Sequence, residues 1–341
     1  MKTPLDPIDF RLLNDWQRSF PLARRPYAEL AHALDIGETE VLERLRALKT
    51  RGHVSRVGAV FRPHVLGWST LAAVAAPAQR LEAVARGRDA HPEVNHNYER
   101  EHPYNLWFVV TAADAGQVAE VLGHIQRQTG LKPLDLPMVA DYHIDLGFDL
   151  GEGHIGRTAG WQRQATASDP NEAARLRAVL DSTDYCLAGA LEPGLALTPR
   201  PYAELAAACG LSEEACLERV RRMVEVGVIR RLGVVVRHHE LGYHANAMVV
   251  WDVPDARVEA AGRLLGAHPV VTLCYQRPRR LPDWPYNLFS MVHGRDRDAV
   301  LAEITRLTAH PLLAGLPHQA LFSRRRFKQR GARYARLEKA A

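Results

Sequence analysis

A histidine, a tyrosine and an arginine alternate along one short segment, at a spacing that would place them on one side of a strand. With the two-residue period of a strand, His96, Tyr98 and Arg100 share one face. An arginine pairs with a carboxylate, a histidine titrates near neutral pH, and a tyrosine donates a hydrogen bond or a proton. The triplet therefore suits an anionic substrate whose reaction moves a proton. The opposite face carries Asn95, Asn97 and Glu99.

The alternative for this segment is a polar strand that faces solvent. The local density of histidines weighs against that alternative. His91, His96 and His102 all fall within residues 91–102, although the whole chain has 16 histidines. We therefore treat the segment as a candidate site.

The segment belongs to a chain that contains an internal duplication. Residues 25–31 (RPYAELA) recur letter for letter as residues 200–206. The correspondence continues at constant spacing until residues 66–67, which match residues 241–242. The spacing then widens toward the end of each copy. We expect two copies of one fold, with a longer loop in the second copy.

The pattern of each copy predicts a winged helix-turn-helix followed by a ferredoxin-like domain. Three short helices precede a β-hairpin at Val54–Val60. A strand-helix-strand-strand-helix-strand order follows, with its last strand at Pro137–Leu146 in the first copy and His318–Arg324 in the second. This α+β arrangement resembles the Lrp/AsnC regulators, and two copies resemble a covalent pseudo-dimer of that unit. Because each sheet needs a cover, we expect the two ferredoxin-like domains to join sheet to sheet.

A Gly-rich, polar stretch at residues 151–169 is typical of a linker between the copies. We place the boundary at residue 165. The predicted domains are a first copy, 1–165, with its winged helix at about 6–62 and its ferredoxin-like domain at about 66–150, and a second copy, 166–341, with the corresponding domains at about 172–238 and 242–328.

Composition is that of an ordinary globular protein, with 47% hydrophobic and 24% charged residues and a net charge of +5. The longest apolar stretches are far shorter than the roughly 20 residues that span a bilayer, so we expect no membrane segment. The N-terminal sequence lacks the apolar segment of a secretory signal and favours the cytoplasm. The spacing of the cysteines predicts neither a zinc site nor a disulfide; they are Cys186, Cys209, Cys216 and Cys274.

Acidic residues stand where a DNA-reading helix needs basic or polar ones. Glu38 and Glu40 open the candidate recognition helix of the first copy, and Glu213 and Glu214 open that of the second. Carboxylates there also favour the helix itself through its dipole, so capping is the alternative explanation. In either case they oppose phosphate contact, and we expect no specific DNA binding. The nearby basic residues, either ordinary exposed charges or contacts to a DNA backbone, are Arg44, Arg46, Lys49, Arg51 and Arg56.

Two strings resemble the signatures of the siroheme decarboxylases. They are residues 96–108 (HNYEREHPYNLWF) and residues 274–289 (CYQRPRRLPDWPYNLF). Their order is similar to the fused NirD-NirL type of heme d1 biosynthesis. The resemblance implies removal of the carboxyl groups of the C12 and C18 acetate side chains of siroheme, which gives didecarboxysiroheme without net oxidation. It also implies no cofactor beyond the iron-containing substrate, and partner subunits of the NirG or NirH type.

Within this resemblance, His96 is the expected proton donor. Tyr98 is the alternative donor or the hydrogen-bond partner of His96, and Arg100 is the expected carboxylate anchor. For His102 three roles stay open: a second acid, an axial iron ligand, or a polar residue of the hairpin. The other expected substrate-binding residues are Tyr104, His143, Tyr275, Arg277, Arg279, Arg280 and Trp284.

The second copy lacks the expected acid, because Leu273 stands at the position of His96. We therefore expect one competent site per chain, with the second copy supplying cations or shape. His64 and His239 occupy equivalent positions after the wing, which favours a structural role for both, and His143 either lines the site or ends a strand. The alternative functions are an Lrp/AsnC-type transcription regulator and a noncatalytic tetrapyrrole-binding protein.

Overall fold

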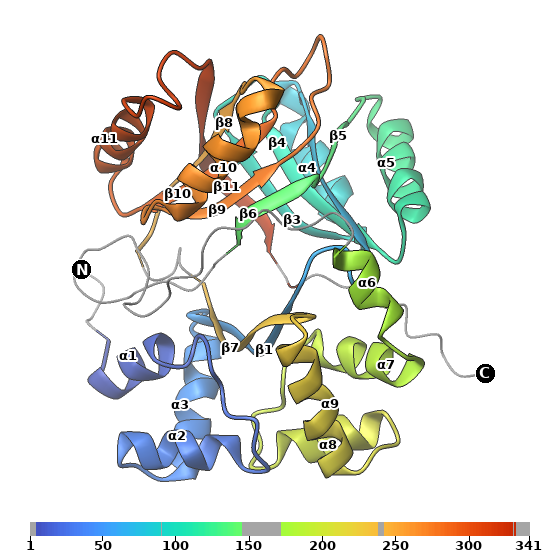
Figure 1. The fold of residues 1–341 in the computed structure, drawn as a ribbon, viewed down its shortest axis with the longest axis vertical. Coiled ribbons are helices and arrows are strands. Elements are labelled where there is room, and N and C mark those ends of the chain that lie inside the picture. The colour runs from blue at the N-terminus through green and yellow to red at the C-terminus, as the bar shows by residue number, and fades with distance from the viewer. Residues whose placement is uncertain (1–4, 90, 145–171, 238–241, 330, 332–341) are drawn as a thin grey trace.

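The chain folds into two lobes that lie one above the other (Figure 1). The computed structural model describes residues 5–89, 91–144, 172–237, 242–329 and 331. In this part of the chain, the lower lobe holds the helices of both helix-turn-helix units, and the upper lobe holds a nine-stranded sheet with helices on its outer sides. The predicted boundary at residue 165 lies outside the described residues.

Local sequence signals start the helices of the lower lobe. In α1 (Pro7–Asn14), the Asp6 carboxylate accepts hydrogen bonds from backbone N–H groups of the first turn. In α7 (Ser182–Leu191), Asp181 and Asp184 form a capping box. The apolar faces of the lobe meet in one core that contains residues of both copies. The other helices of this lobe are α2 (Pro26–Leu34), α3 (Glu38–Thr50), α6 (Glu172–Ala178), α8 (Pro201–Ala208) and α9 (Glu213–Glu225).

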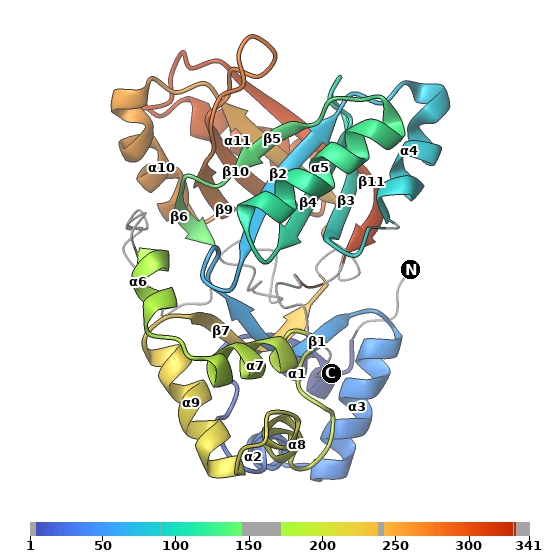
Figure 2. The same ribbon diagram turned by 90° about the vertical axis from the view of Figure 1, so that its right-hand side faces the viewer.

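The predicted β-hairpin within each winged helix is wrong. β1 (Val54–Phe61) pairs with β7 (Ile229–Val236) of the other copy, antiparallel, with Gly58 opposite Gly233. The residues that follow Phe61 turn toward the upper lobe and form no second strand of a hairpin. Each wing strand is therefore paired by the wing strand of the other copy. These two wing strands, β1 and β7, join the copies in the lower lobe (Figure 2).

Each copy contributes a ferredoxin-like set of elements to the upper lobe. The first copy supplies β2 (Trp68–Val74), η1 (Ala78–Arg80), α4 (Leu81–Asp89), β3 (Val94–Arg100), β4 (Leu106–Ala112), α5 (Ala115–Thr129), β5 (Leu134–Pro137) and β6 (Ala140–Ile144). The second copy supplies β8 (Ala245–Trp251), η3 (Asp255–Arg257), α10 (Val258–Ala267), β9 (Val271–Gln276), β10 (Leu288–Gly294), α11 (Arg297–Thr308) and β11 (His318–Gln329). None of the described helices in either lobe is long and apolar enough to cross a membrane.

The last strand of each copy crosses from its own sheet to the sheet of the other copy. The strand order is β5-β2-β4-β3-β11-β8-β10-β9-β6. In the first copy, β5 pairs with β2 and β6 pairs with β9. In the second copy, β11 pairs first with β8 and then, from Ser323 onward, with β3. The predicted strand Pro137–Leu146 is confirmed over Ala140–Ile144, which is β6. The separate strand β5 was not predicted, because the chain leaves one sheet and enters the other at residues 138–139.

The nine strands form one hydrogen-bonded order that is divided at β11 into a first sheet (β5, β2, β4 and β3) and a second sheet (β8, β10, β9 and β6). These two sheets face each other across an apolar layer, as predicted. Trp107 and Leu136 of the first copy share one cluster with Met248, Phe289 and Leu321 of the second. Helices α4 and α5 cover the outer side of the first sheet, and α10 and α11 cover the outer side of the second (Figures 1 and 2). The space between the sheets is therefore lined by residues of both copies.

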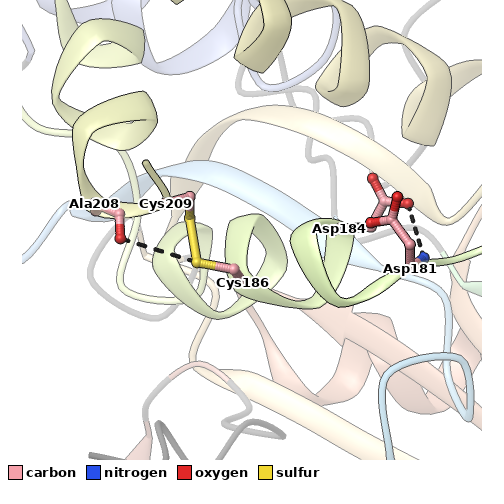
Figure 3. Close-up of a disulfide and its surroundings, with 5 residues drawn as sticks. All are labelled: Asp181, Asp184, Cys186, Ala208 and Cys209. Carbon is pink, nitrogen blue, oxygen red and sulfur yellow. Dashed lines mark hydrogen bonds between the residues drawn. A yellow bond between two sulfur atoms is a disulfide. The ribbon is translucent and has the colours of Figure 1, made fainter. Parts of the chain in front are cut away.

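Cys186 and Cys209 form a disulfide between α7 and the end of α8 (Figure 3). Their Cα atoms are 5.9 Å apart, within the usual range for a disulfide. The prediction of no disulfide is therefore wrong. The sequence separation carries no recognisable motif, and it is the packing of α7 against α8 that brings the two side chains together. Cys216 and Cys274 are buried free thiols.

Gly233 tests the packing of β7 against the chain that follows α1. A Cβ at Gly233 would lie 2.3 Å from the carbonyl oxygen of Gln17, so Gly233→Ala must displace the chain that follows α1. We expect this variant to lose about 1–3 kcal/mol of unfolding free energy, as overpacked sites do, measured by urea denaturation. Gly87→Ala in α4 is the control, because its added Cβ meets nothing within 4 Å. Equal stability of the two variants would contradict this arrangement.

Candidate active site

β3 carries His96, Tyr98 and Arg100 on its inner side, as the alternation predicts. The rings of His96 and Tyr98 are stacked with centroids 6.2 Å apart, and the guanidinium carbon of Arg100 lies 5.9 Å from the Tyr98 ring centre. Asn97 points the other way and donates a hydrogen bond to the carbonyl oxygen of Ala85 in α4. The three predicted side chains therefore lie between the sheets, with His96 toward the lower lobe.

Arg100 is buried and has no carboxylate ion pair among the described residues. Its Nη1 donates to the carbonyl oxygen of Leu321 at 3.0 Å, and its Nε has no partner. Burial lowers the pKa of Arg100 to about 10, while the neighbouring Tyr275 and Tyr98 act in the opposite direction. The group stays charged at neutral pH. Because an unpaired buried charge costs several kcal/mol, its position indicates a site for an anion.

Arg277 of the second copy repeats this arrangement. Its Nη1 donates to the carbonyl oxygen of Leu136, its guanidinium carbon lies 4.5 Å from the Tyr275 ring centre, and its Nε has no partner. Each arginine thus binds a backbone carbonyl of the other copy. Since Tyr275 also acts on the charge of Arg100, we treat Tyr98, Arg100, Tyr275 and Arg277 as one group, the arginine–tyrosine cluster.

His96 is a neutral imidazole in the protein alone. Burial, and after it the positive charge of Arg56 in β1, lower the pKa of His96 to about 4. Its Nδ1 is buried and has no hydrogen-bond partner. As a proton donor, His96 therefore needs nearby negative charge to take up its proton.

The two halves of the cluster differ in the charge that lies across the strand. Arg326 in β11 is opposite Tyr98, whereas Asp141 in β6 is opposite Tyr275. Asp141 forms an ion pair with Arg230. The half around Tyr98 is therefore the more positive one, and it suits a polyanionic ligand better.

Leu273 has no ionisable group to match that of His96, but a histidine of the first copy lies near that half. His64, in the turn between β1 and β2, has both ring nitrogens buried without a partner and a backbone φ of 61°. Burial lowers the pKa of His64 to about 4, with Arg277 as the next cause. Spacing along the chain does not reveal this proximity, because His64 and Arg277 belong to different copies. His239 lies outside the described residues.

His102, Tyr104 and Trp284 lie at the end of the sheets away from the lower lobe. The Nδ1 atom of His102 accepts a hydrogen bond from the backbone N–H of Tyr104 at 3.0 Å, and its ring centre lies 5.4 Å from that of Trp284. Trp284 is fully buried against Trp107. Trp284 also stacks on Phe289, the cross-strand neighbour of Tyr275, and so borders the arginine–tyrosine cluster. Among the described residues, no hydrogen bond or ring contact joins His102 or Tyr104 directly to the cluster. No group of three or more potential metal ligands occurs in the described ranges, and an axial role of His102 toward iron stays a prediction.

Arg279 and Arg280 are tied to other parts of the fold. Arg279 forms ion pairs with Asp252 and Asp255. The Nε atom of Arg280 donates to the carbonyl oxygen of Asp135 at 2.7 Å. These contacts fix the longer loop of the second copy, and neither side chain joins the arginine–tyrosine cluster.

His143 lies on the outer side of the sheet. It is opposite Cys274 in the pairing of β6 with β9, and its Cβ lies 3.2 Å from the place that a Cβ would take at Gly266 in α10. The Cys274 thiol also points to this helix, where it contacts the carbonyl oxygen of Gly262. His143 is therefore separated from Tyr275 by the sheet.

The chain matches the models of two known domain families and several known proteins. The chain matches the "AsnC-like ligand binding domain" at residues 65–143 and 240–328, and the "Siroheme decarboxylase NirDL-like HTH domain" at residues 9–54 and 189–230. It is 46% identical to the siroheme decarboxylase NirDL subunit of Paracoccus pantotrophus, over 96% of this chain and 97% of that protein. A NirG subunit of Pseudomonas aeruginosa is 44% identical over 43% of this chain and its own full length.

A solved structure of a similar protein contains a tetrapyrrole. The crystal structure of a siroheme decarboxylase NirDL with an iron-uroporphyrin III analogue has a TM-score of 0.64 to this chain and 27% sequence identity. The match covers 96% of this chain and 93% of that one. The tandem Lrp/AsnC-like fold expected from the sequence is confirmed.

The low pKa values of His64 and His96 predict a pH-dependent stability. Both are about 4 in the folded protein and near 6.5 in the unfolded chain. Between these values the unfolded chain binds more protons, so the free energy of unfolding falls as the pH is lowered from about 6.5 to about 4. Each histidine contributes at most about 1.4 kcal/mol per pH unit. The free energy of unfolding, measured by urea denaturation at several pH values, should depend less steeply on pH in His64→Gln and in His96→Gln than in the exposed control His32→Gln. Identical slopes in all three would refute the buried neutral state.

Proposed function

The chain belongs to the siroheme decarboxylase family, and we propose that its own substrate is siroheme. The proposed reaction removes the carboxyl groups of the C12 and C18 acetate side chains to give didecarboxysiroheme for heme d1 biosynthesis. The observation that carries the proposal is the arginine–tyrosine cluster, which sets two buried guanidinium groups of Arg100 and Arg277 beside an apolar layer. A macrocycle with carboxylates on its periphery matches this combination of surfaces.

The chemistry needs a proton and no electrons. The bond between the acetate methylene carbon and the carboxylate breaks, carbon dioxide leaves, and the electron pair stays on the methylene carbon. A proton then completes the methyl group. Arg100 and Arg277 hold carboxylates, His96 donates the proton, and Tyr98 is the alternative donor. We therefore propose no cofactor other than the iron-containing substrate.

The substrate itself supplies the negative charge that His96 needs. Raising its pKa from about 4 to about 7 takes about 4 kcal/mol, at 1.36 kcal/mol per pKa unit. One carboxylate about 4 Å away supplies about 4 kcal/mol at an effective dielectric constant of about 20. Binding of a polycarboxylate can therefore raise the pKa of His96 enough for the imidazole to be protonated near neutral pH.

The half around Tyr98 is our proposed reaction site. It has His96 where the other half has Leu273, and Arg326 where the other half has Asp141. The second half then supplies Arg277 and the walls of the site. This asymmetry supports one competent site per chain.

We also propose that the protein acts in the cytoplasm and associates with related subunits. The similarity of a complete NirG subunit to less than half of this chain supports association with related subunits of the NirG or NirH type. Such a partner would present the same type of fold.

His96→Ala should separate binding from turnover. Macrocycle contacts and arginine–carboxylate pairs do not need this imidazole, whereas loss of a general acid typically lowers the rate by about 10²–10⁴-fold. The assay is anaerobic incubation with siroheme followed by mass analysis of the product, with binding measured by absorbance. Leu273→Ala is the matched control in the second copy and should change turnover little. Near-normal turnover of His96→Ala would move the donor role to Tyr98 or to the second copy, and a wild-type protein that binds siroheme without converting it would be a carrier.

We also propose that the lower lobe does not bind DNA specifically. Glu38 is ion-paired with Arg25, and Glu213 with Arg200, at the beginnings of α3 and α9. Arg44 is held by carboxylates of its own copy. We expect no footprint on the promoter of its own gene at physiological salt. Protection that survives competitor DNA at nanomolar protein would restore the regulator alternative.

A further inference from the structure

A cation of the lower lobe reaches the site. Arg56 belongs to the wing strand β1, but its Nη1 atom lies 3.1 Å from the place that a Cβ would take at Gly331, just beyond the end of β11. Gln329 near that end of β11 is the cross-strand neighbour of His96. The guanidinium of Arg56 therefore approaches His96 from the side of the lower lobe.

The side chain of Arg56 is held in place, yet its charge is not neutralised by an ion pair in the described residues. Its Nη2 donates to the carbonyl oxygen of Ala59 at 2.9 Å. Its Cβ packs on Gly194 of the second copy, where an added Cβ would come within 2.8 Å. Burial lowers the pKa of Arg56, and the charge of Glu192 opposes this only in part.

Three buried nitrogen atoms without partners belong to residues that are linked one to the next. They are the Nε of Arg56, which acts on His96, the Nδ1 of His96, which stacks on Tyr98, and the Nε of Arg100, on the other side of Tyr98. Buried polar atoms without partners are rare in folded proteins, and their occurrence on linked residues is what a ligand with several anionic groups would satisfy. The lower lobe contributes one of the three.

We propose that Arg56 binds a carboxylate of the tetrapyrrole beside His96 and is a specificity-determining residue of the decarboxylation site. The identity of the ligand rests on the proposed function, whereas the anion site itself rests on the unpartnered atoms. The helix-turn-helix lobe would then serve as one wall of the site.

Arg56 also couples the protonation of His96 to the ligand. Its positive charge opposes a proton on His96 in the protein alone, and a carboxylate bound to Arg56 removes that opposition. The other titratable group that faces His96 is Tyr98 on the same strand. The flanking strands present the uncharged Val109 and Gln329. Among the described residues, Arg56 is therefore the charge through which this coupling acts.

The test uses the full chain and three variants. Arg56→Gln removes the charge, Arg56→Lys keeps it, and Arg231→Gln is the matched control in β7 at the equivalent position of the second copy. The probes are siroheme and fully methyl-esterified siroheme, which has no anionic carboxylates. The two readouts are the dissociation constant, measured by absorbance, and the pKa of His96, followed by NMR without ligand.

We expect Arg56→Gln to weaken siroheme binding by about 10–100-fold, to leave binding of the ester nearly unchanged, and to raise the pKa of His96. Arg56→Lys should restore most of both properties, and Arg231→Gln should match the wild type. Loss of binding in Arg56→Lys equal to that in Arg56→Gln, with the His96 pKa unchanged in both, would show a structural role and overturn the proposal.

The proposed function and this inference can fail separately. If the wild type binds siroheme through Arg56 but releases no carbon dioxide, the reaction is wrong and the role of Arg56 stands. If the wild type decarboxylates siroheme while Arg56→Gln behaves like Arg231→Gln, the role of Arg56 is wrong and the reaction stands.

Discussion

The exchange of final strands between the two copies is the constraint on which the rest of the molecule depends. β6 completes the sheet of the second copy, and the end of β11 completes the sheet of the first. Without the strand that comes from the other copy, each sheet would expose an edge of unpaired backbone groups. Arg100 and Arg277 each donate to a carbonyl of the other copy. The two buried guanidinium groups are therefore positioned by hydrogen bonds between the copies, and one copy alone would lack these hydrogen bonds.

Buried positive charge makes the interior ready for an anion at a cost in stability. Hydrogen bonds to backbone carbonyls and contacts with tyrosine rings reduce that cost but do not remove it. An acidic partner for Arg100 within the fold would stabilise the protein, yet it would compete with a carboxylate of the substrate. Such opposition between stability and activity is common where a site must attract a charged ligand.

Local patterns predicted what depends on neighbours in sequence, and they failed where distant segments meet. The alternation around Tyr98 correctly placed three side chains on one face, and the duplication correctly gave two fused folds. The pairing of β1 with β7, the crossing of β6 and the disulfide of Cys186 with Cys209 depend on contacts between remote segments. Trp284 illustrates the same limit, because it packs against His102 and Trp107 of the first copy and Phe289 of β10, all of them outside its own loop.

Covalent fusion of the copies changes what a single mutation can do. In a dimer of identical chains, symmetry repeats every substitution at both related positions. Here Arg326 and Asp141 occupy corresponding cross-strand positions and differ in sign. One gene encodes both halves as separate codons, so selection can adjust catalysis in one half and folding in the other. The two copies then keep the same backbone fold, while the side chains at corresponding positions can change independently.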